Sequence, residues 1–371
     1  MTMSKTVLIS GAGIAGSTAA YWLGRNGFDV TVVERARAQR SSGNPVDVKG
    51  PAVDVIEGMG VMPSVRAAAS RVDRMSFVDP AGRERSRLRL SAFQGGAGAR
   101  EVEITRADLA AILLEAARDF AELRWSDSIS EIAQHSAGVD VTFENGAAGC
   151  YDYVIGADGL HSNVRRLAFG AESEFIGHMG MYVATLPVDR AFGDEREVVM
   201  LNLPGRAVSV HPSKGKAVAA FLFRSRAVPG FDHRDLDQHK RLVTDAFAEP
   251  IGIFAEVLDQ LKAADDIYFD SVSRISLPQW FNGRVGLLGD AGSSLSLFGD
   301  GSTLAIAGAH TLAHELARTP DHPHAALSAY EQRHRRLVEP RQRGFRAARA
   351  LMVPATSTGI TIRNAITRFM R

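Results

Sequence analysis

The stretch Val7-Leu8-Ile9-Ser10-Gly11-Ala12-Gly13-Ile14-Ala15-Gly16 decides the fold of this chain. A short apolar run enters a G-x-G-x-x-G loop, small residues follow at 17–20, and a β-branched run at 30–33 ends at Glu34. This order predicts a strand, a phosphate-binding loop, a helix and a second strand. A glycine-rich turn in an ordinary α/β domain explains only the loop, whereas a dinucleotide site also explains the strand, the helix and the acid.

Each glycine of the loop has an expected task. Gly11 makes the tight turn, Gly13 lets a pyrophosphate approach the backbone, and Gly16 lets the helix pack closely on the sheet. The free N–H groups and the positive dipole end of the helix then face the phosphates. Glu34 lies where a carboxylate accepts hydrogen bonds from an adenosine ribose. FAD and NAD share this pattern, so the choice of dinucleotide stays open at this point.

The composition narrows the class of protein. With 371 residues, 45% of them hydrophobic, the chain can bury a full core and is expected to hold two connected domains. The net charge of +1 gives no general attraction to nucleic acid, and the single Cys150 excludes a disulfide reductase. We expect no signal peptide before the first strand, and no apolar run approaches the roughly 20 residues of a membrane span. These features predict a soluble, cytoplasmic protein.

The residue pattern changes where a second domain is expected. Residues 75–78 and 84–90 alternate around the turn sequence at 79–82, which predicts a hairpin, and 175–271 predict a mostly antiparallel sheet with helical cover. The tail from Tyr330 is helical in pattern and rich in arginine. We assign 1–72, 101–172 and 273–320 to the dinucleotide-binding domain, 73–100 and 173–272 to a substrate domain, and 321–371 to a helical segment bridging the two.

Polar signatures follow three predicted strands. They are the glycine loop with Glu34, the sequence Gly-Ala-Asp-Gly at 156–159, and Gly289-Asp290-Ala291. Because ligands of open α/β sheets bind at the carboxyl ends of the strands, the three signatures are expected to meet at one cofactor. Together they resemble the class A FAD-dependent aromatic hydroxylases, the para-hydroxybenzoate hydroxylase superfamily. The compact members, such as the tetracycline-inactivating monooxygenases, are the most similar in length and pattern.

This resemblance covers nearly the whole chain and implies an α/β fold, in which a Rossmann-like FAD-binding domain carries an inserted, mostly antiparallel substrate sheet and a C-terminal helix. It also implies cofactor contacts by position. Glu34 binds the adenosine ribose, Arg106 contacts the ribityl and phosphate region, and Asp290 holds the ribityl chain and pyrophosphate. Asp47 lies beside the flavin, and Asp158 belongs to the motif tied to both FAD and NAD(P)H.

The basic loop after Glu34 permits two interpretations. Arg35 and Arg40 are explained equally well by a solvated surface loop and by contact with a phosphate. The resemblance places Arg40 where the tetracycline-oxidising relatives have an arginine linked to NADPH.

The third signature leads into a helix with a glycine-rich start. Gly299, Gly301, Ser302 and Thr303 let the backbone approach the isoalloxazine, and the positive end of the helix favours the anionic reduced flavin. The family commonly has Gly-Gln-Gly here, whereas this chain has Asp300 between the glycines. An acid facing the flavin would oppose that anion, so we expect the side chain to turn away.

The resemblance implies an FAD-dependent monooxygenase. NAD(P)H reduces FAD, oxygen adds at C4a, and the hydroperoxide delivers an oxygen atom to an aromatic or polycyclic small molecule, such as a natural product or an antibiotic. The alternatives are a flavin-dependent reductase of a polyprenyl or other unsaturated substrate, and a non-catalytic flavin-binding or small-molecule-binding protein. We assign no amino-acid catalyst and no metal site, and we expect a monomer or weak dimer.

Residues of the inserted sheet are candidates for substrate contact. Met179, Tyr182, Phe221 and Phe223 are the apolar ones, and His178 and Arg224 are the polar ones. Core packing is the preferred explanation for each.

Overall fold

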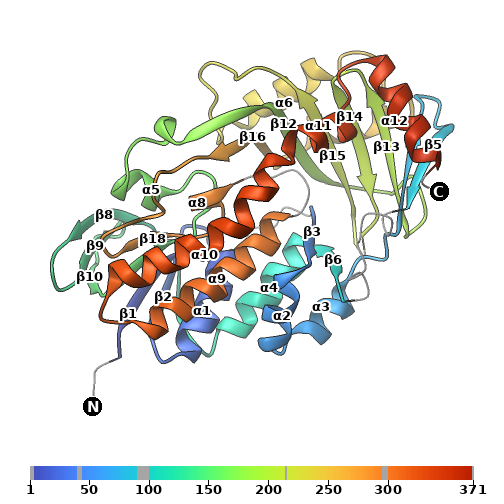
Figure 1. Cartoon of the computed structure of the whole chain (residues 1–371). Coiled ribbons are helices and arrows are strands. Elements are labelled where there is room, and N and C mark those ends of the chain that lie inside the picture. Colours follow the sequence, from blue (N-terminus) through green and yellow to red (C-terminus); the bar gives the residue numbers. More distant parts are fainter. Residues whose placement is uncertain (1–3, 40–43, 90–99, 214, 295–299, 370–371) are drawn as a thin grey trace.

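The computed structural model describes residues 4–39, 44–89, 100–213, 215–294 and 300–369. Two sheets lie at opposite ends of the molecule, and a long C-terminal helical segment runs from one to the other (Figure 1). No helix in the described ranges is both long and apolar enough to cross a membrane.

The first sheet belongs to the predicted dinucleotide-binding domain and has the order β17-β18-β11-β1-β2-β7. All neighbouring pairs are parallel except β17 with β18. Its central strand β1 is almost fully buried, as expected of a parallel strand covered on both faces. The strands are β1 (Thr6–Ser10), β2 (Asp29–Glu34), β7 (Glu122–Trp125), β11 (Tyr153–Gly156), β17 (Phe281–Asn282) and β18 (Val285–Leu287).

Helices cover one face of this sheet, with α9 packed between α1 and α10 (Figure 1). The small three-stranded sheet β10-β9-β8 packs into the same core through apolar side chains such as Val139 and Phe143. The helices are α1 (Ile14–Arg25), α2 (Pro51–Gly58), α3 (Met62–Ala68), α4 (Arg106–Ala117), α5 (Asn163–Ala168), α8 (Asp290–Ser293), α9 (Asp300–Arg318) and α10 (Pro323–Arg343). The small sheet contains β8 (Ile129–Gln134), β9 (Val139–Phe143) and β10 (Ala148–Tyr151).

The second sheet has the order β16-β12-β15-β14-β13-β4-β5 and is antiparallel except for the pair β13 and β4. The assigned boundary at residue 272 falls inside β16, which continues to Ile275 because it pairs with the first residues of the long strand β12. The strands are β4 (Arg74–Val78), β5 (Glu84–Arg89), β12 (Ile176–Val188), β13 (Glu197–Leu203), β14 (Arg206–His211), β15 (Ala217–Arg224) and β16 (Tyr268–Ile275).

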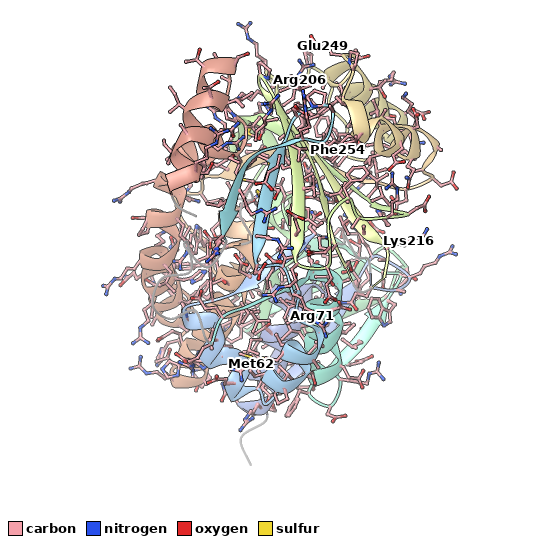
Figure 2. The ribbon with its side chains drawn as sticks, turned by 90° about the vertical axis from the view of Figure 1, so that its right-hand side faces the viewer. Met62, Arg71, Arg206, Lys216, Glu249 and Phe254 are labelled. Carbon is pink, nitrogen blue, oxygen red and sulfur yellow. The ribbon has the colours of Figure 1, made fainter. Side chains whose placement is uncertain are left out.

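The two faces of the second sheet have different surroundings. One face packs against α6 (Leu236–Ala246) and α7 (Ala255–Ala263), with Phe254 buried on that side (Figure 2). Figure 2 also shows Arg206 and Glu249 side by side at the rim, where they form an ion pair of 2.8 Å. Because strand residues alternate between faces, every second residue of these strands points the other way. That other face borders the space between the two sheets.

Three further elements join the domains. The strands β3 (Pro45–Val48) and β6 (Val102–Thr105) form a two-stranded antiparallel ribbon, and α11 (Phe345–Met352) and α12 (Ser357–Phe369) follow α10. The helix α10 packs along α9, and α12 packs on β5 (Figure 1). The C-terminal segment therefore contacts both domains.

The aromatic candidates for substrate contact lie on the helix-covered face. Tyr182, Phe221 and Phe223 are at most 4% exposed and belong to the core shared with α6 and α7. The side chains of His178 and Arg224 bond the backbone carbonyls of Ser225 and Val353, respectively. Core packing and these hydrogen bonds to backbone carbonyls account for the five residues.

Candidate functional site

The glycine loop has the geometry that its spacing predicts. Gly11 has φ of +105°, and a Cβ there would lie 2.6 Å from the Ala157 carbonyl oxygen. A Cβ on Gly16 would lie 1.9 Å from the Gly11 carbonyl oxygen, so only glycine permits this approach of helix to loop. A Cβ on Gly13 would meet no atom within 4 Å in the part of the chain that the structure describes. The space in front of Gly13 is therefore open to a ligand.

A cavity begins at this open space and runs between the two sheets. Its volume is about 260 Å³, near the lower end of the roughly 300–1,000 Å³ of typical small-molecule pockets. Residues that follow β1, β11 and β18 meet here, as the sequence predicts. The dinucleotide-binding side is lined by Gly13, Ile14, Ala15, Asn44, Pro45, Val46, Arg106, Ala157, Gly159, Asp290, Gly301, Ser302 and Ala305.

Other predicted site residues lie behind this lining. Arg40 and Gly299 fall outside the described residues. Arg35 is exposed, and the remaining residues support the lining from the loop, the strand ends and the start of α9. These supporting residues are Gly11, Ala12, Gly16, Glu34, Asp47, Asp158, Gly289 and Thr303.

Glu34 holds the glycine loop. Its carboxylate accepts hydrogen bonds from the N–H groups of Ala12 at 3.0 Å and Ala36 at 2.9 Å. The acid at the end of β2 therefore fixes the loop at the end of β1. A ribose hydroxyl that reaches Glu34 has to share these oxygens with the backbone.

Asp158 is saturated by protein donors. Its carboxylate accepts hydrogen bonds from the Ser162 hydroxyl at 2.5 Å and from the N–H groups of Asn163 and Val164 at 2.9 and 3.1 Å. Burial raises the pKa of this carboxyl despite these donors. The acid thereby positions the start of α5 and its own neighbours Ala157 and Gly159, which do line the cavity.

Asp290 and Arg106 carry charge into the cavity. Both line it, and among the described residues neither side chain has a hydrogen-bond partner. Burial raises the pKa of the Asp290 carboxyl, and the Arg106 guanidinium opposes that rise. A carboxylate and a guanidinium without protein partners match the hydroxyl donors and phosphate oxygens of a dinucleotide. The donor set therefore fits FAD at this place.

The start of α9 is joined to β3. The hydroxyls of Ser302 and Thr303 donate to the carbonyl oxygen of Asp47, at 2.7 and 2.9 Å. The N–H of Lys49 donates to the Thr303 hydroxyl at 3.2 Å. Gly301 and Ser302 at this end of the helix line the cavity. The positive end of α9 is thus held at the cavity wall.

A lysine compensates the unusual acid. Lys49 Nζ lies 2.8 Å from Asp300 Oδ1 and 3.0 Å from Asp47 Oδ2, and all three side chains are about one-third exposed. The two carboxylates raise the pKa of the Lys49 ammonium group against the opposing effect of its burial. The side chain of Asp300 is thus directed at Lys49. The sequence analysis did not identify Lys49 as a site residue. The only indication in the sequence was its position two residues after Asp47.

The second sheet forms an uncharged wall opposite the glycine loop. Burial lowers the pKa of His211 to about 4, so its imidazole is neutral at pH 7. Its Nε2 lies 3.2 Å from the Ser209 hydroxyl. Burial raises the pKa of the Tyr268 phenol, which is likewise neutral. The wall comprises Val183, Thr185, Met200, Ser209, His211, Ala220, Leu222 and Tyr268, with Met352 beside them.

Comparison with known proteins gives consistent matches along the chain. A family model described as the FAD binding domain matches residues 4–341. An uncharacterised protein of Mycobacterium tuberculosis is 37% identical over 91% of this chain and 92% of its own length. A flavin-dependent monooxygenase from an unknown prokaryotic organism is 34% identical over 92% of this chain and 89% of its own. The crystal structure of the tetracycline destructase Tet(51) superposes with a TM-score of 0.86 at 29% identity, covering 99% and 96%.

Proposed function

Because the chain belongs to the FAD-binding domain family and is a flavin-dependent monooxygenase of the tetracycline-destructase type, we propose that it oxidises an uncharged aromatic or polycyclic molecule with NAD(P)H and O₂. The main support is one cavity that continues from an open glycine loop to an uncharged sheet wall. The open glycine loop suits the cofactor, and the uncharged sheet wall suits the substrate.

The residues that would hold FAD are those without competing protein contacts. The open backbone at Gly13 and Ala15 suits the pyrophosphate, and Arg106 and Asp290 offer the charges that phosphates and ribityl hydroxyls require. When bound, FAD supplies two-electron redox chemistry and the activation of oxygen.

The start of α9 provides the electrostatics for that chemistry. The N–H groups of its first turn concentrate positive partial charge near Gly301 and Ser302, which stabilises negative charge in the cavity. Lys49 neutralises Asp300 at the same helix end. Without that pairing, the acid would cancel part of the helix dipole. We propose that Lys49 preserves an electropositive wall.

The sheet wall orients the substrate and excludes water. Val183, Met200 and Leu222 supply apolar surface, which a flat aromatic skeleton can cover. Ser209 and His211 supply neutral hydrogen-bonding groups at fixed places on β14. An aromatic carboxylate would leave its charge unpaired against this wall. Burying even an uncharged polar group without a hydrogen-bond partner costs on the order of 2–7 kcal/mol, and an unpaired charge costs more. The wall therefore favours phenols, ketones and amides over acids.

The tetracycline destructases among the structural relatives support a polycyclic substrate for this chain. Antibiotic or natural-product modification is the proposed biochemical role. NADPH and NADH are both open as the electron donor.

The test uses FAD-loaded protein with a matched panel of neutral polycyclic phenols and the corresponding aromatic acids. We expect NAD(P)H oxidation that rises with the neutral ligands, consumes one O₂ per turnover and yields an oxygenated product. Ligand-stimulated NAD(P)H oxidation that proceeds without O₂ and reduces the ligand would instead support the reductase. Stimulation by the acids alone would refute the proposed substrate class.

A further inference from the structure

A second group of ligand-type side chains lies outside the cavity, on the three-stranded sheet β10-β9-β8 (Figure 1). His135 follows β8, Asp140 belongs to β9 and Cys150 belongs to β10. His135 Nε2 lies 3.4 Å from Asp140 Oδ1 and 3.8 Å from Cys150 Sγ. The three ligand atoms lie within 4.8 Å of one another, and all three residues are exposed.

Strand pairing brings these residues together. Cys150 and Asp140 are direct partners in the antiparallel register of β10 and β9. His135 enters a tight hairpin, closed by its N–H donating to the Gly138 carbonyl oxygen at 2.9 Å. A Cβ on Gly138 would lie 3.2 Å from Cys150 Sγ and 2.9 Å from the Tyr151 carbonyl oxygen, so glycine leaves room for the thiol. The sequence gives no spacing motif for this cluster, because the ligands meet only through the sheet.

The distances from His135 Nε2, 3.4 Å to Asp140 Oδ1 and 3.8 Å to Cys150 Sγ, are at and slightly above those of a tetrahedral metal centre. Zinc binds sulfur at about 2.3 Å and nitrogen or oxygen at about 2.0–2.2 Å, so adjacent ligand atoms are about 3.3–3.6 Å apart. One imidazole, one carboxylate and one thiolate form a borderline-soft donor set, which hard ions such as Mg²⁺ and Ca²⁺ do not favour. We propose that His135, Asp140 and Cys150 bind a divalent transition-metal ion of the Zn²⁺ type, with its remaining position open to solvent.

Binding exchanges protons for the metal. The metal displaces the Cys150 thiol proton into solvent as the sulfur–metal bond forms. Coordination through Nε2 places the imidazole proton of His135 on Nδ1, which now accepts a 3.3 Å contact from the Ala137 N–H. That weak contact is lost, and one proton is released per metal bound.

The experiment titrates tag-free, FAD-loaded protein with Co²⁺ as a spectroscopic probe and then displaces it with Zn²⁺, under a non-thiol reductant. We expect one Co²⁺ per chain, a sulfur-to-cobalt charge-transfer band in the difference spectrum, and tetrahedral ligand-field bands beyond the flavin absorption. Cys150→Ser removes the charge-transfer band. His135→Gln and Asp140→Asn weaken binding by more than the roughly 10–100-fold that loss of a ligand's outer hydrogen-bond partner costs.

The matched control is His322→Gln, which replaces an exposed histidine outside the cluster and leaves Co²⁺ affinity unchanged. Co²⁺ binding without a charge-transfer band, or equal affinity in His135→Gln and the unsubstituted protein, would overturn the proposed site. Absence of any saturable one-to-one binding would do the same. Far-UV circular dichroism of each variant establishes that the fold is retained.

Discussion

Replacing Gly13 with alanine separates cofactor binding from folding. Gly13 has φ of −78° and ψ of −171°, a conformation that alanine adopts without strain. The new methyl group meets no atom of the described residues within 4 Å. The free energy of unfolding of the apoprotein is therefore expected to stay constant or to rise by about 0.4–1 kcal/mol, since alanine restricts the unfolded chain.

The same methyl group occupies the space proposed for the pyrophosphate. Loss of one charge-assisted hydrogen bond costs about 1.5–3 kcal/mol. Because about 1.4 kcal/mol corresponds to a tenfold change in Kd, Gly13→Ala is expected to weaken FAD binding about 10–100-fold. The control is Gly16→Ala, whose Cβ would lie 1.9 Å from the Gly11 carbonyl oxygen and which is expected not to fold.

Two assays decide the outcome. Urea unfolding of the apoprotein measures stability, and quenching of flavin fluorescence during titration measures Kd. Gly13→Ala protein that is stable and binds FAD as tightly as the unsubstituted chain would refute the placement of the pyrophosphate. Gly13→Ala protein that fails to fold would refute the structural reasoning, because nothing in the described chain opposes that methyl group.

Three further predictions concern charge. Lys49→Met leaves Asp300 without its counter-ion. It is expected to lower the flavin reduction potential, measured by spectroelectrochemistry, by tens of millivolts, at about 30 mV per 1.4 kcal/mol for two electrons. The control Lys49→Arg is expected to keep the potential of the unsubstituted protein. Two carboxylates raise the pKa of His161 to about 9 against the opposing effect of burial. The stability that protonated His161 adds to the fold, up to about 3 kcal/mol, is therefore present below pH 6.5 and lost as the pH rises through 9. Urea unfolding of His161→Gln should show no such loss. Burial raises the pKa of Glu103 to about 7. The buried carboxylate therefore destabilises the fold as the pH rises from the pKa that Glu103 has in the unfolded chain through 7. Glu103→Gln should be more stable than the unsubstituted protein at pH 8, by up to about 3 kcal/mol, and equally stable at pH 4.

The dinucleotide half was predictable because its signals are local. The run 7–16 contains the strand, the turn and the start of the helix in consecutive residues, and the steric requirement for Gly16 comes from the Gly11 carbonyl oxygen in the same run. Thr105 also caps α4, and its hydroxyl accepts a hydrogen bond from the Asp108 N–H at 3.1 Å. Such features depend on neighbours in the chain and not on tertiary packing.

The substrate side was not predictable to the same degree. In β15 both faces are apolar, so the alternation of Ala220 and Leu222 with Phe221 and Phe223 does not say which face the helices cover. The large aromatic residues pack under α6 and α7, and the smaller ones line the cavity. The same limit applies to His211, whose neutral state depends on burial between two domains. Tertiary arrangement decides both.

The departures of this chain from its family pattern are best understood through their local partners. Asp300 would weaken an electropositive helix start if it were alone, yet β3 places Lys49 within 2.8 Å of it and bonds the same helix end through Ser302 and Thr303. One short strand and the lysine that follows it thus supply the position and the counter-ion of the α9 terminus. Because the compensating lysine directly follows β3, far from Asp300 in the sequence, a substitution at either position has to be judged together with the other.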